Sequence, residues 1–443
     1  MRLSRIKLQN YRRFEKFEID LHPELTVIAA RNGQGKTTIL EAIAAALGPF
    51  VGAFDFGRSE HIRRTDARYS VQDKSYENEQ NFPVIIDSEM IEPVIQWQRA
   101  LNSAKGRTTT KEAAPLSDLG KLLQEDLRKN SDVALPVLRY YSSKRLWVSH
   151  KNTARKAILT ESRTAGYEDC LSSLSSFAQL QDWVRKATNA IQQQRELPGY
   201  EKSNLEARLN GIKKAVDTVM GEEGWSHFHH SFIYDELAMY HPDHGALPIS
   251  LLSDGVRAMI SLAADLALRC ARLNGYLGEL APLQSSGIVL IDEVDLHLHP
   301  AWQQRVVQAL RKAFPKLQFI ISSHSPQVLS TIKSDNIRVV FKNNDGHWLA
   351  ESPVQEILGR ESAIALNDVM GVNPIPPVEA AKLIATYTAV IENGDDDSDE
   401  GRALRRQLVD IYGEKHPVLL DADKLIRFQR FKLRKSSKDE WQG

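Results

Sequence analysis

The stretch that decides the fold of this chain lies near its N-terminus and reads Ala30-Arg31-Asn32-Gly33-Gln34-Gly35-Lys36-Thr37-Thr38. It has the pattern of a phosphate-binding P-loop, except that alanine replaces the first glycine. The apolar residues 25–30 before it predict a buried strand, and the composition of residues 37–47 after it predicts a helix. Backbone N–H groups of such a loop, together with the N-terminus of the following helix, attract phosphate oxygens. Because a predicted strand precedes the stretch and a predicted helix follows it, we interpret it as a phosphate-binding loop and not as a simple glycine-rich turn.

The residue types in the loop indicate which ligand it takes. Lys36 is placed to bridge the β and γ phosphates of a nucleoside triphosphate, and the Thr37 hydroxyl is placed to ligate Mg²⁺. We therefore expect ATP and Mg²⁺ as cofactors. The nucleotide-binding residues expected from the loop are Asn32, Gly33, Gln34, Gly35, Lys36, Thr37 and Thr38.

A second motif supplies acidic residues. Residues 287–291 form an apolar strand that ends in Asp292 and Glu293. Asp292 is expected to hold the Mg²⁺ shell, and Glu293 is expected to act in catalysis by polarising the attacking water. Alone, the pattern also fits an ordinary strand with exposed acids at its end, but a P-loop upstream favours the functional reading.

Two further motifs lie on either side of this strand. Ser253-Asp254-Gly255 precedes a long helix with apolar periodicity, where serine also suits a simple N-cap. His324 follows the apolar residues 317–321, at a predicted strand end, where a structural histidine is the alternative. His297 and His299 could suggest a metal site, but no third ligand is evident, so we favour a role in the loop.

In this order the motifs resemble those of ABC-type ATPase heads found in RecF, SMC and OLD-like proteins. The resemblance implies an α/β fold, a P-loop ATPase head with a helical insertion and a C-terminal helical region. It implies that Ser253 and Gly255 contact the γ-phosphate held by a second head, so that the active form is a homodimer. It also implies that His324 hydrogen-bonds the γ-phosphate and acts in catalysis.

Three positions depart from that family pattern or match it weakly. Asp254 replaces a small residue of the signature, so ATP binding is the safer expectation and hydrolysis could be slow. Arg12 resembles a first-strand residue that approaches the phosphates, although a solvated edge arginine fits it nearly as well. No Q-loop glutamine is evident, and residues 142–145 occupy its position.

Within this class, residues 135–147 and 292–325 resemble the PtuA ATPases of Septu antiphage systems and related retrons. That resemblance implies head dimers or a higher oligomer, a separate HNH nuclease subunit (PtuB-like), and contact with DNA through the complex.

One alternative is a RecF-like DNA-repair clamp. The other alternative is an OLD-like ATPase-nuclease. Such a nuclease has a metal-binding acid pair, and Asp421-Ala422-Asp423 of this chain superficially resembles it. Only 20 residues follow Asp423, too few for the remaining strands of that fold, so a helix is simpler.

We expect four regions along the chain. Residues 1–150 and 241–355 form the two parts of the ATPase head, residues 151–240 form the helical insertion, and residues 356–443 form a partner-docking helical region. Within the insertion, helical periodicity breaks at Pro198-Gly199 and predicts a helical hairpin. The acidic run 395–400 suits a solvated loop. Near the C-terminus, apolar positions interleaved with basic ones predict an amphipathic helix that could dock a partner or DNA phosphates, or simply be solvated: Leu425, Phe428 and Leu433 among Lys424, Arg427, Arg430 and Lys432.

Composition argues against several other classes of protein. Lys plus Arg and Asp plus Glu both number 57, so no overall field draws the chain to nucleic acid or to an anionic membrane. The two cysteines, Cys170 and Cys270, are far apart and form neither a disulfide framework nor a zinc motif. No apolar run reaches the length of a membrane helix, so the sequence favours a cytoplasmic protein without membrane contact.

Overall fold

The computed structural model describes residues 1–71, 78–143, 162–172 and 177–439. The chain divides into two compact units, residues 1–371 and residues 372–443. The first unit extends beyond the boundary expected near residue 356, because α10 (Ser362–Asp368) packs against α9 (Pro326–Leu329) with Ala365 fully buried. We call the first unit the head and the second the C-terminal unit.

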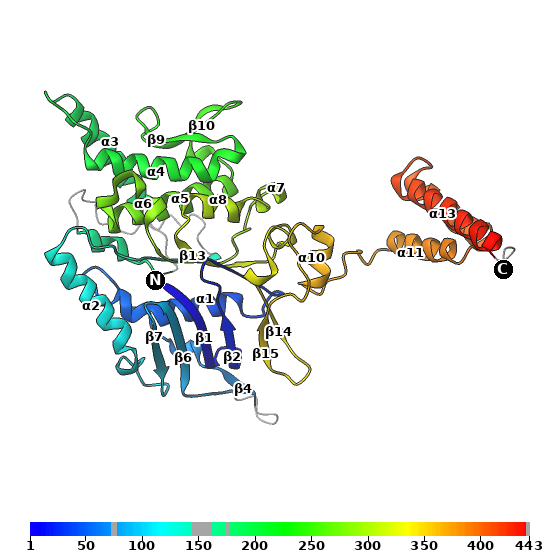
Figure 1. Ribbon diagram of the computed structural model, residues 1–443, viewed down its shortest axis with the longest axis horizontal. Helices are drawn as coiled ribbons and strands as arrows, with labels where there is room; N and C mark the ends of the chain where they lie inside the picture. Colours follow the sequence, from blue (N-terminus) through cyan, green and yellow to red (C-terminus); the bar gives the residue numbers. More distant parts are fainter. Residues whose placement is uncertain (72–77, 144–161, 173–176, 440–443) are drawn as a thin grey trace. The chain divides into compact units, whose positions relative to one another are not determined.

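A six-stranded sheet lies in the head, with the strand order β15-β14-β3-β13-β12-β8 (Figure 1). Its strands are β3 (Leu25–Ala29), β8 (Val137–Tyr141), β12 (Gly287–Ile291), β13 (Leu317–Ser323), β14 (Ile337–Lys342) and β15 (Trp348–Glu351). All pair in parallel except β15, which runs antiparallel at one edge. Every residue of β3, β12 and β13 is buried, because parallel strands in the middle of a sheet are covered on both faces.

A second, antiparallel sheet has the order β2-β1-β6-β7. Its strands are β1 (Arg2–Tyr11), β2 (Phe14–Asp20), β6 (Val84–Glu92) and β7 (Ile95–Leu101). β1 and β2 are antiparallel neighbours and directly precede the buried strand β3 in the chain. Helix α1 (Lys36–Val51) contacts β6 of this sheet and β12 and β13 of the parallel sheet, and it is buried almost all round. The P-loop therefore begins a helix that is packed against both sheets.

The remaining elements of the head surround these layers. The predicted hairpin is confirmed as α3 and α4, and α4 lies against α5 and α8 (Figure 1). A three-stranded antiparallel sheet, β11-β10-β9, follows the hairpin and was not predicted, because histidine-rich strands hide the alternation of apolar residues. The bounds are β4 (Tyr69–Val71), β5 (Asn78–Gln80), α2 (Ala114–Lys129), α3 (Phe177–Arg195), α4 (Asn204–Met220), β9 (Ser226–Ser231), β10 (Glu236–His241), β11 (Gly245–Pro248), α5 (Asp254–Leu273), α6 (Ala281–Gln284), α7 (Pro300–Gln303) and α8 (Val306–Ala313).

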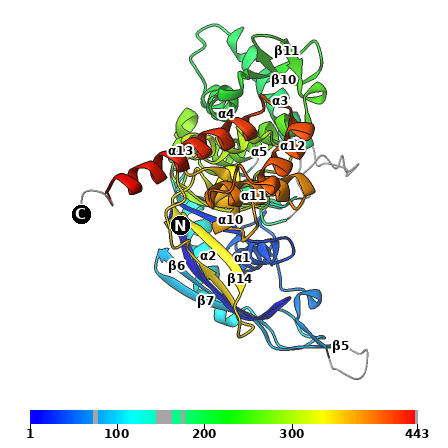
Figure 2. The ribbon, with the colours of Figure 1, turned by 90° about the vertical axis from the view of Figure 1, so that its right-hand side faces the viewer.

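The described residues of the C-terminal unit form three helices, α11 (Glu379–Glu392), α12 (Asp399–Tyr412) and α13 (Pro417–Asp439) (Figure 2). They share a small core of Tyr387, Ile391, Leu408 and Leu419. No helix among the described residues is both long enough and apolar enough to cross a bilayer.

The acidic run at residues 395–400 is partly structured rather than forming a solvated loop. Ser398 caps α12 by accepting a hydrogen bond from the Gly401 N–H, which places the acidic residues 399 and 400 in the first helical turn. Negative charge is favourable there because of the helix dipole. Arg430 of α13 pairs with Asp396 and Asp397 at 2.7 and 2.8 Å, so the run also holds α13 to the start of α12.

The acid pair near the C-terminus lies on α13 and does not converge on one point. Asp423 pairs with Arg405 of α12 at 2.6 Å, and Asp421 pairs with Lys424 at 2.8 Å. Each carboxylate thus has its own cation. This arrangement favours the helix over the metal-binding pair of an OLD-like nuclease.

Candidate nucleotide-binding site

Three neighbouring strands of the parallel sheet bring the predicted motifs to one edge. The P-loop follows β3, His324 follows β13, and Asp292 with Glu293 follows β12, and β13 lies between the other two. The carboxyl ends of parallel strands meet at the same edge of a sheet, which is where open α/β folds bind ligands. The motifs are therefore neighbours, although up to 292 positions separate them along the chain (324 minus 32).

The P-loop itself requires its glycines. Gly33 and Gly35 have φ angles of +75° and +99°, in the left-handed region that L-residues disfavour. A Cβ atom at Gly35 would also lie 2.6 Å from Cζ of Phe14 and 3.0 Å from Cδ of Arg13. Substitution of Gly35 would therefore strain the loop in two ways.

Lys36 points back over the loop. Its Nζ donates to the carbonyl oxygen of Ala30 at 3.1 Å and lies 3.4 Å from Nδ1 of His324. Burial lowers the pKa of Lys36 to about 8, although the charges of Asp292, Glu293 and Asp295 raise it. Within the described part of the chain, Lys36 forms no ion pair with a carboxylate. A half-desolvated ammonium held by neutral groups is suited to receive an anion.

Asp292 and Thr37 form the oxygen-rich side of the site. Thr37 Oγ1 donates to one carboxylate oxygen of Asp292 at 2.8 Å, and Ser322 Oγ donates to the other at 2.6 Å. Asp292 is completely buried. A hydroxyl and a carboxylate are hard donors of the kind Mg²⁺ takes beside substrate phosphates and water. The donor chemistry therefore fits the predicted Mg²⁺ ligands.

Glu293 has an unusual backbone conformation. Its φ is +50°, which costs a non-glycine residue on the order of 1 kcal/mol or more. The Glu293 N–H donates to Ser322 Oγ at 2.8 Å, so one serine holds both acidic residues in place. Sequence reasoning did not single out Ser322; the available signal was a hydroxyl ending an apolar strand.

His324 lies beside Lys36, as expected for a group that contacts the same phosphate. Its pKa is lowered, first by burial and then by the positive charge of Lys36, while Asp295 and Asp292 raise it. The neutral imidazole can donate or accept a hydrogen bond without adding a second charge. Its role in catalysis remains a prediction.

The Ser253 motif occupies the first turn of α5. Ser253 is the exposed N-cap residue, but its hydroxyl makes no capping hydrogen bond, so a simple N-cap does not account for it. Asp254 pairs with Arg257 on the same helix, which neutralises the carboxylate that departs from the family pattern. A Cβ atom at Gly255 would lie 2.4 Å from the His297 carbonyl oxygen, so α5 packs directly on the loop after Glu293. No described hydrogen bond joins Ser253 to the P-loop of its own chain.

The two arginines of the β1–β2 turn have different surroundings. Arg12 pairs with Glu41 and Asp66, so its charge is already neutralised by two carboxylates. Arg13 instead lies beside Gly35 of the P-loop, with its guanidinium 5.3 Å from the Trp348 ring centroid. Arg13 therefore lies next to the P-loop, whereas the expected approach of Arg12 to the phosphates stays a prediction.

The remaining residues that were predicted for the site lie in or near the P-loop or outside the described residues. Gln34 Oε1 accepts a hydrogen bond from the Arg31 N–H at 3.0 Å and so braces the loop, Asn32 is exposed at its tip, and Thr38 is buried in α1. Of the segment proposed to replace the Q-loop, residues 144 and 145 lie outside the described residues. No group of three or more His, Cys, Asp or Glu side chains among the described residues could hold a metal, His297 and His299 included.

Arg31 connects the P-loop to the end of the head. Its Nε donates to the carbonyl oxygen of Met370 at 3.1 Å, and its Nη2 donates to that of Gly371. Gly371 is the last residue of the head. The loop that is expected to hold phosphate thus also holds the point where the chain leaves the head.

Comparison with known proteins finds similar sequences. A family model described as "AAA domain" matches residues 5–219. The "Retron Vc95 probable ATPase" of Vibrio cholerae serotype O1 biovar El Tor is 25% identical over 460 residues, covering 92% of this chain and 86% of that protein. The "Septu protein PtuA" of Bacillus mycoides (strain KBAB4) is 32% identical over 142 residues, which are 31% of this chain and 18% of that protein. Among solved structures, the "SMC head domain from Thermotoga maritima" is 16% identical with a TM-score of 0.39, covering 80% of this chain and 99% of that one.

The sheet order, the buried P-loop helix and the three motifs at one sheet edge confirm the expected α/β architecture. The matches to retron and Septu proteins confirm the resemblance drawn from the motifs. The chain is similar in sequence to the retron ATPases and to Septu PtuA, and its head is an α/β fold in which a P-loop precedes a buried helix.

Proposed function

We propose that this chain is the ATP-binding and ATP-hydrolysing subunit of an antiphage defence complex, in which ATP joins two heads and controls a separate HNH nuclease. The observation that carries the proposal is the convergence of Lys36, Thr37 and Asp292 with His324 at the ends of three adjacent strands. The defence role is supported by the names of the relatives, which are retron and Septu proteins.

Each side chain of the site has a distinct task in this proposal. Lys36 would contact the β and γ phosphates, and Thr37 and Asp292 would hold Mg²⁺, which would supply positive charge beside the transferred phosphoryl group. Glu293 orients the attacking water and accepts its proton, and His324 donates a hydrogen bond to a γ-phosphate oxygen. Ser322 is a positioning residue, because it touches Asp292 and the Glu293 backbone rather than the phosphates.

The second head completes the site. The exposed Ser253 hydroxyl and the first-turn N–H groups of α5 are directed at the γ-phosphate bound by the partner head, where a helix N-terminus favours an anion. Each head thus contributes Lys36 to one nucleotide and Ser253 to the other. ATP is then the ligand that makes the two heads adhere, and hydrolysis separates them.

Replacement of Ser253 by glutamate tests this arrangement. A carboxylate at the helix start repels the partner's phosphate, so Mg²⁺–ATP should no longer produce a dimer, while each head still binds ATP. Mass photometry with and without ATP should show at least a tenfold loss of dimer in Ser253→Glu. The matched control is Ser103→Glu, which changes another exposed serine, in the loop after β7. An ATP-dependent dimer that persists in Ser253→Glu contradicts the proposal.

The nuclease partner requires a separate test. Phe428 and Phe431 of α13 are 60% and 66% exposed, which makes this face of the C-terminal unit a candidate docking surface. Tagged protein from its native host should co-purify with metal-dependent DNA cleavage activity, and a Phe428→Glu/Phe431→Glu variant should lose that activity while retaining ATP binding. Ile233→Glu, which alters an exposed apolar residue of the head, is the control. ATP-strengthened DNA binding without associated cleavage would support the RecF-like alternative instead.

A further inference from the structure

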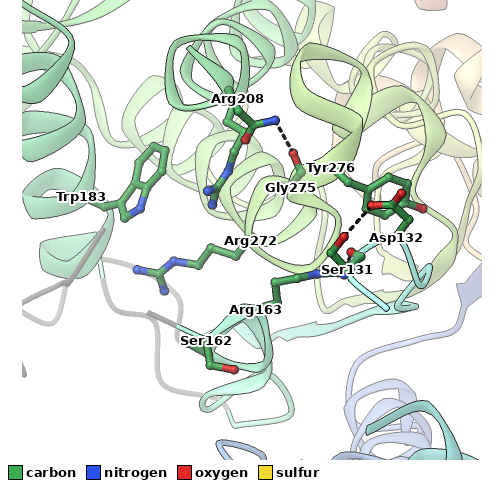
Figure 3. A pocket seen from close by; sticks show the side chains of 11 residues that line it. Ser131, Asp132, Ser162, Arg163, Trp183, Arg208, Arg272, Gly275 and Tyr276 are labelled. Carbon is green, nitrogen blue, oxygen red and sulfur yellow. Dashed lines mark hydrogen bonds between the residues drawn. The ribbon is translucent and has the colours of Figure 1, made fainter. Parts of the chain in front are cut away.

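A second polar pocket lies in the head, lined by none of the residues assigned to the nucleotide site. Its volume is about 280 Å³, at the lower end of the range for small-molecule sites. The α3–α4 hairpin, the C-terminal end of α5 and the segments around residues 131 and 163 form its walls (Figure 3). The residues that carry the argument are Asp132, Arg163, Trp183, Arg208, Arg272 and Tyr276.

Positive charge is in excess in this pocket. Three arginines line it, Arg163, Arg208 and Arg272, and Asp132 is the single lining carboxylate among the described residues. Counted over these lining side chains alone, three positive charges minus one negative charge leave a formal excess of two positive charges. A phosphate monoester carries about −1.5 to −2 at neutral pH, so one such group would balance the pocket.

The three arginines have different roles in the pocket. Arg163 donates to the carbonyl oxygens of Ser131, Val133 and Leu273, so its hydrogen bonds go to neutral groups and its charge remains available to the pocket. Arg208 and Arg272 extend from α4 and α5 toward the same space beside Trp183 (Figure 3). A planar guanidinium matches phosphate oxygens with paired hydrogen bonds, which suits these two for contact with the ligand.

Arg208 is held in place without a partner for its charge among the described residues. Its guanidinium lies against the backbone of Gly275, where a Cβ atom would be 3.3 Å from Nε, and it is 5.7 Å from the Trp183 ring centroid. The buried Nε has no hydrogen-bond partner, and no carboxylate among the described residues lies within ion-pair distance of this side chain. Burial, and then the charges of Arg272 and Arg163, lower the pKa of Arg208 to about 10. The fold thus holds a cation that nothing described in the chain neutralises.

The pocket also lies at the far end of the helix that begins with the Ser253 motif. Arg272 is in the last turn of α5, and Arg163 donates to the carbonyl oxygen of Leu273, its final residue. A 20-residue helix is about 30 Å long, so the pocket and the Ser253 motif are at opposite ends of one rigid element. A ligand that draws in Arg272 therefore acts directly on α5.

We propose that this pocket binds the phosphate group of a nucleotide, either free or at the end of a nucleic-acid strand, as an effector distinct from the ATP of the P-loop. The phosphate lies between the guanidinium groups of Arg208 and Arg272. The attached sugar and base occupy the rest of the cavity, which is larger than a phosphate group needs. Binding of the effector does not depend on the ATP-driven dimer, whereas its influence on the Ser253 motif rests on the proposed function.

The test is a calorimetric titration with the P-loop already filled. The full-length protein, saturated with Mg²⁺ and AMP-PNP, is titrated with thymidine 5′-monophosphate, with the 5′-phosphorylated dinucleotide pTpT, and with unphosphorylated TpT. We expect a phosphorylated probe to bind at least about tenfold more tightly than TpT, since hydrogen bonds to charged groups contribute that much or more. Binding of the monophosphate identifies a free nucleotide as sufficient, whereas binding of pTpT alone identifies a strand end.

Arg208→Gln and Arg272→Gln should each lower the affinity of the protein for the phosphorylated probe by roughly tenfold or more. Arg195→Gln is the matched control, because Arg195 is an exposed arginine of the same hairpin that pairs with Glu206 outside the pocket. Since the Arg208 charge has no partner in the part of the chain that the structure describes, Arg208→Gln should leave the Tm of the free protein unchanged or higher. Equal affinity for pTpT and TpT, or no binding of any probe, overturns the proposal, as does a lowered Tm in Arg208→Gln with unchanged probe affinity.

Discussion

Lys36→Ala is expected to abolish ATP binding, with at least about a 100-fold loss of affinity. The substitution removes the ammonium that meets the β and γ phosphates, and hydrogen bonds between charged partners contribute about 1.5–3 kcal/mol each. The backbone N–H groups of the loop remain, but they carry no full charge. Titration with a fluorescent ATP analogue measures the loss directly.

The variant should fold normally. Lys36 is a buried cation with neutral hydrogen-bond partners, so its removal relieves a desolvation cost instead of breaking an ion pair. An unchanged Tm therefore separates lost binding from lost structure. Lys312→Ala, an exposed lysine of α8, serves as the control for loss of one positive charge. Wild-type affinity for ATP in Lys36→Ala would refute the assignment of this site.

Glu293→Gln is expected to stop hydrolysis while preserving ATP binding. The amide keeps the shape of the side chain but cannot accept the proton of the attacking water, and a general base contributes about 10²- to 10⁴-fold to rate. Phosphate release in steady state should fall by that factor. Because ATP then persists, the joined pair of heads should accumulate and become visible by size-exclusion chromatography.

Glu222→Gln is the matched control, since Glu222 is an exposed glutamate that pairs with Arg305 away from the sheet edge. It should hydrolyse ATP at the wild-type rate. Turnover in Glu293→Gln that equals wild type would assign the base to another residue. A catalytically dead variant that stays monomeric with ATP would instead contradict the link between ATP and head pairing.

The main site was predictable from sequence because its parts are local patterns placed by one simple rule. A P-loop, an apolar strand ending in acids and a strand ending in His324 each identify a parallel strand, and parallel strands deliver their ends to one edge. Their mutual contacts follow from the sheet order, which no single motif contains. The structure supplied that order, and with it the contact between Lys36 and His324.

Other features depend on geometry that the sequence pattern hides. The different surroundings of Arg12 and Arg13 could not be read from the sequence, because Asn10 and Arg12 both have positive φ, which disrupts the alternation of a strand at the turn. The role of Ser322 arises from one hydroxyl shared by two adjacent residues of another strand. The arginines of the second pocket come from three separate segments and carry no common motif.

The hydrogen bonds from Arg31 to the carbonyl oxygens of Met370 and Gly371 connect the P-loop to the residues at which the chain leaves the head for the C-terminal unit. We expect a triphosphate bound in the loop to compete with those carbonyls for the same guanidinium, because a dense negative charge attracts it more strongly than a neutral dipole does. Release of Arg31 would free the segment that leads to α11, α12 and α13. Nucleotide binding would then change the restraint on the C-terminal unit through one side chain, without any rearrangement of the sheet.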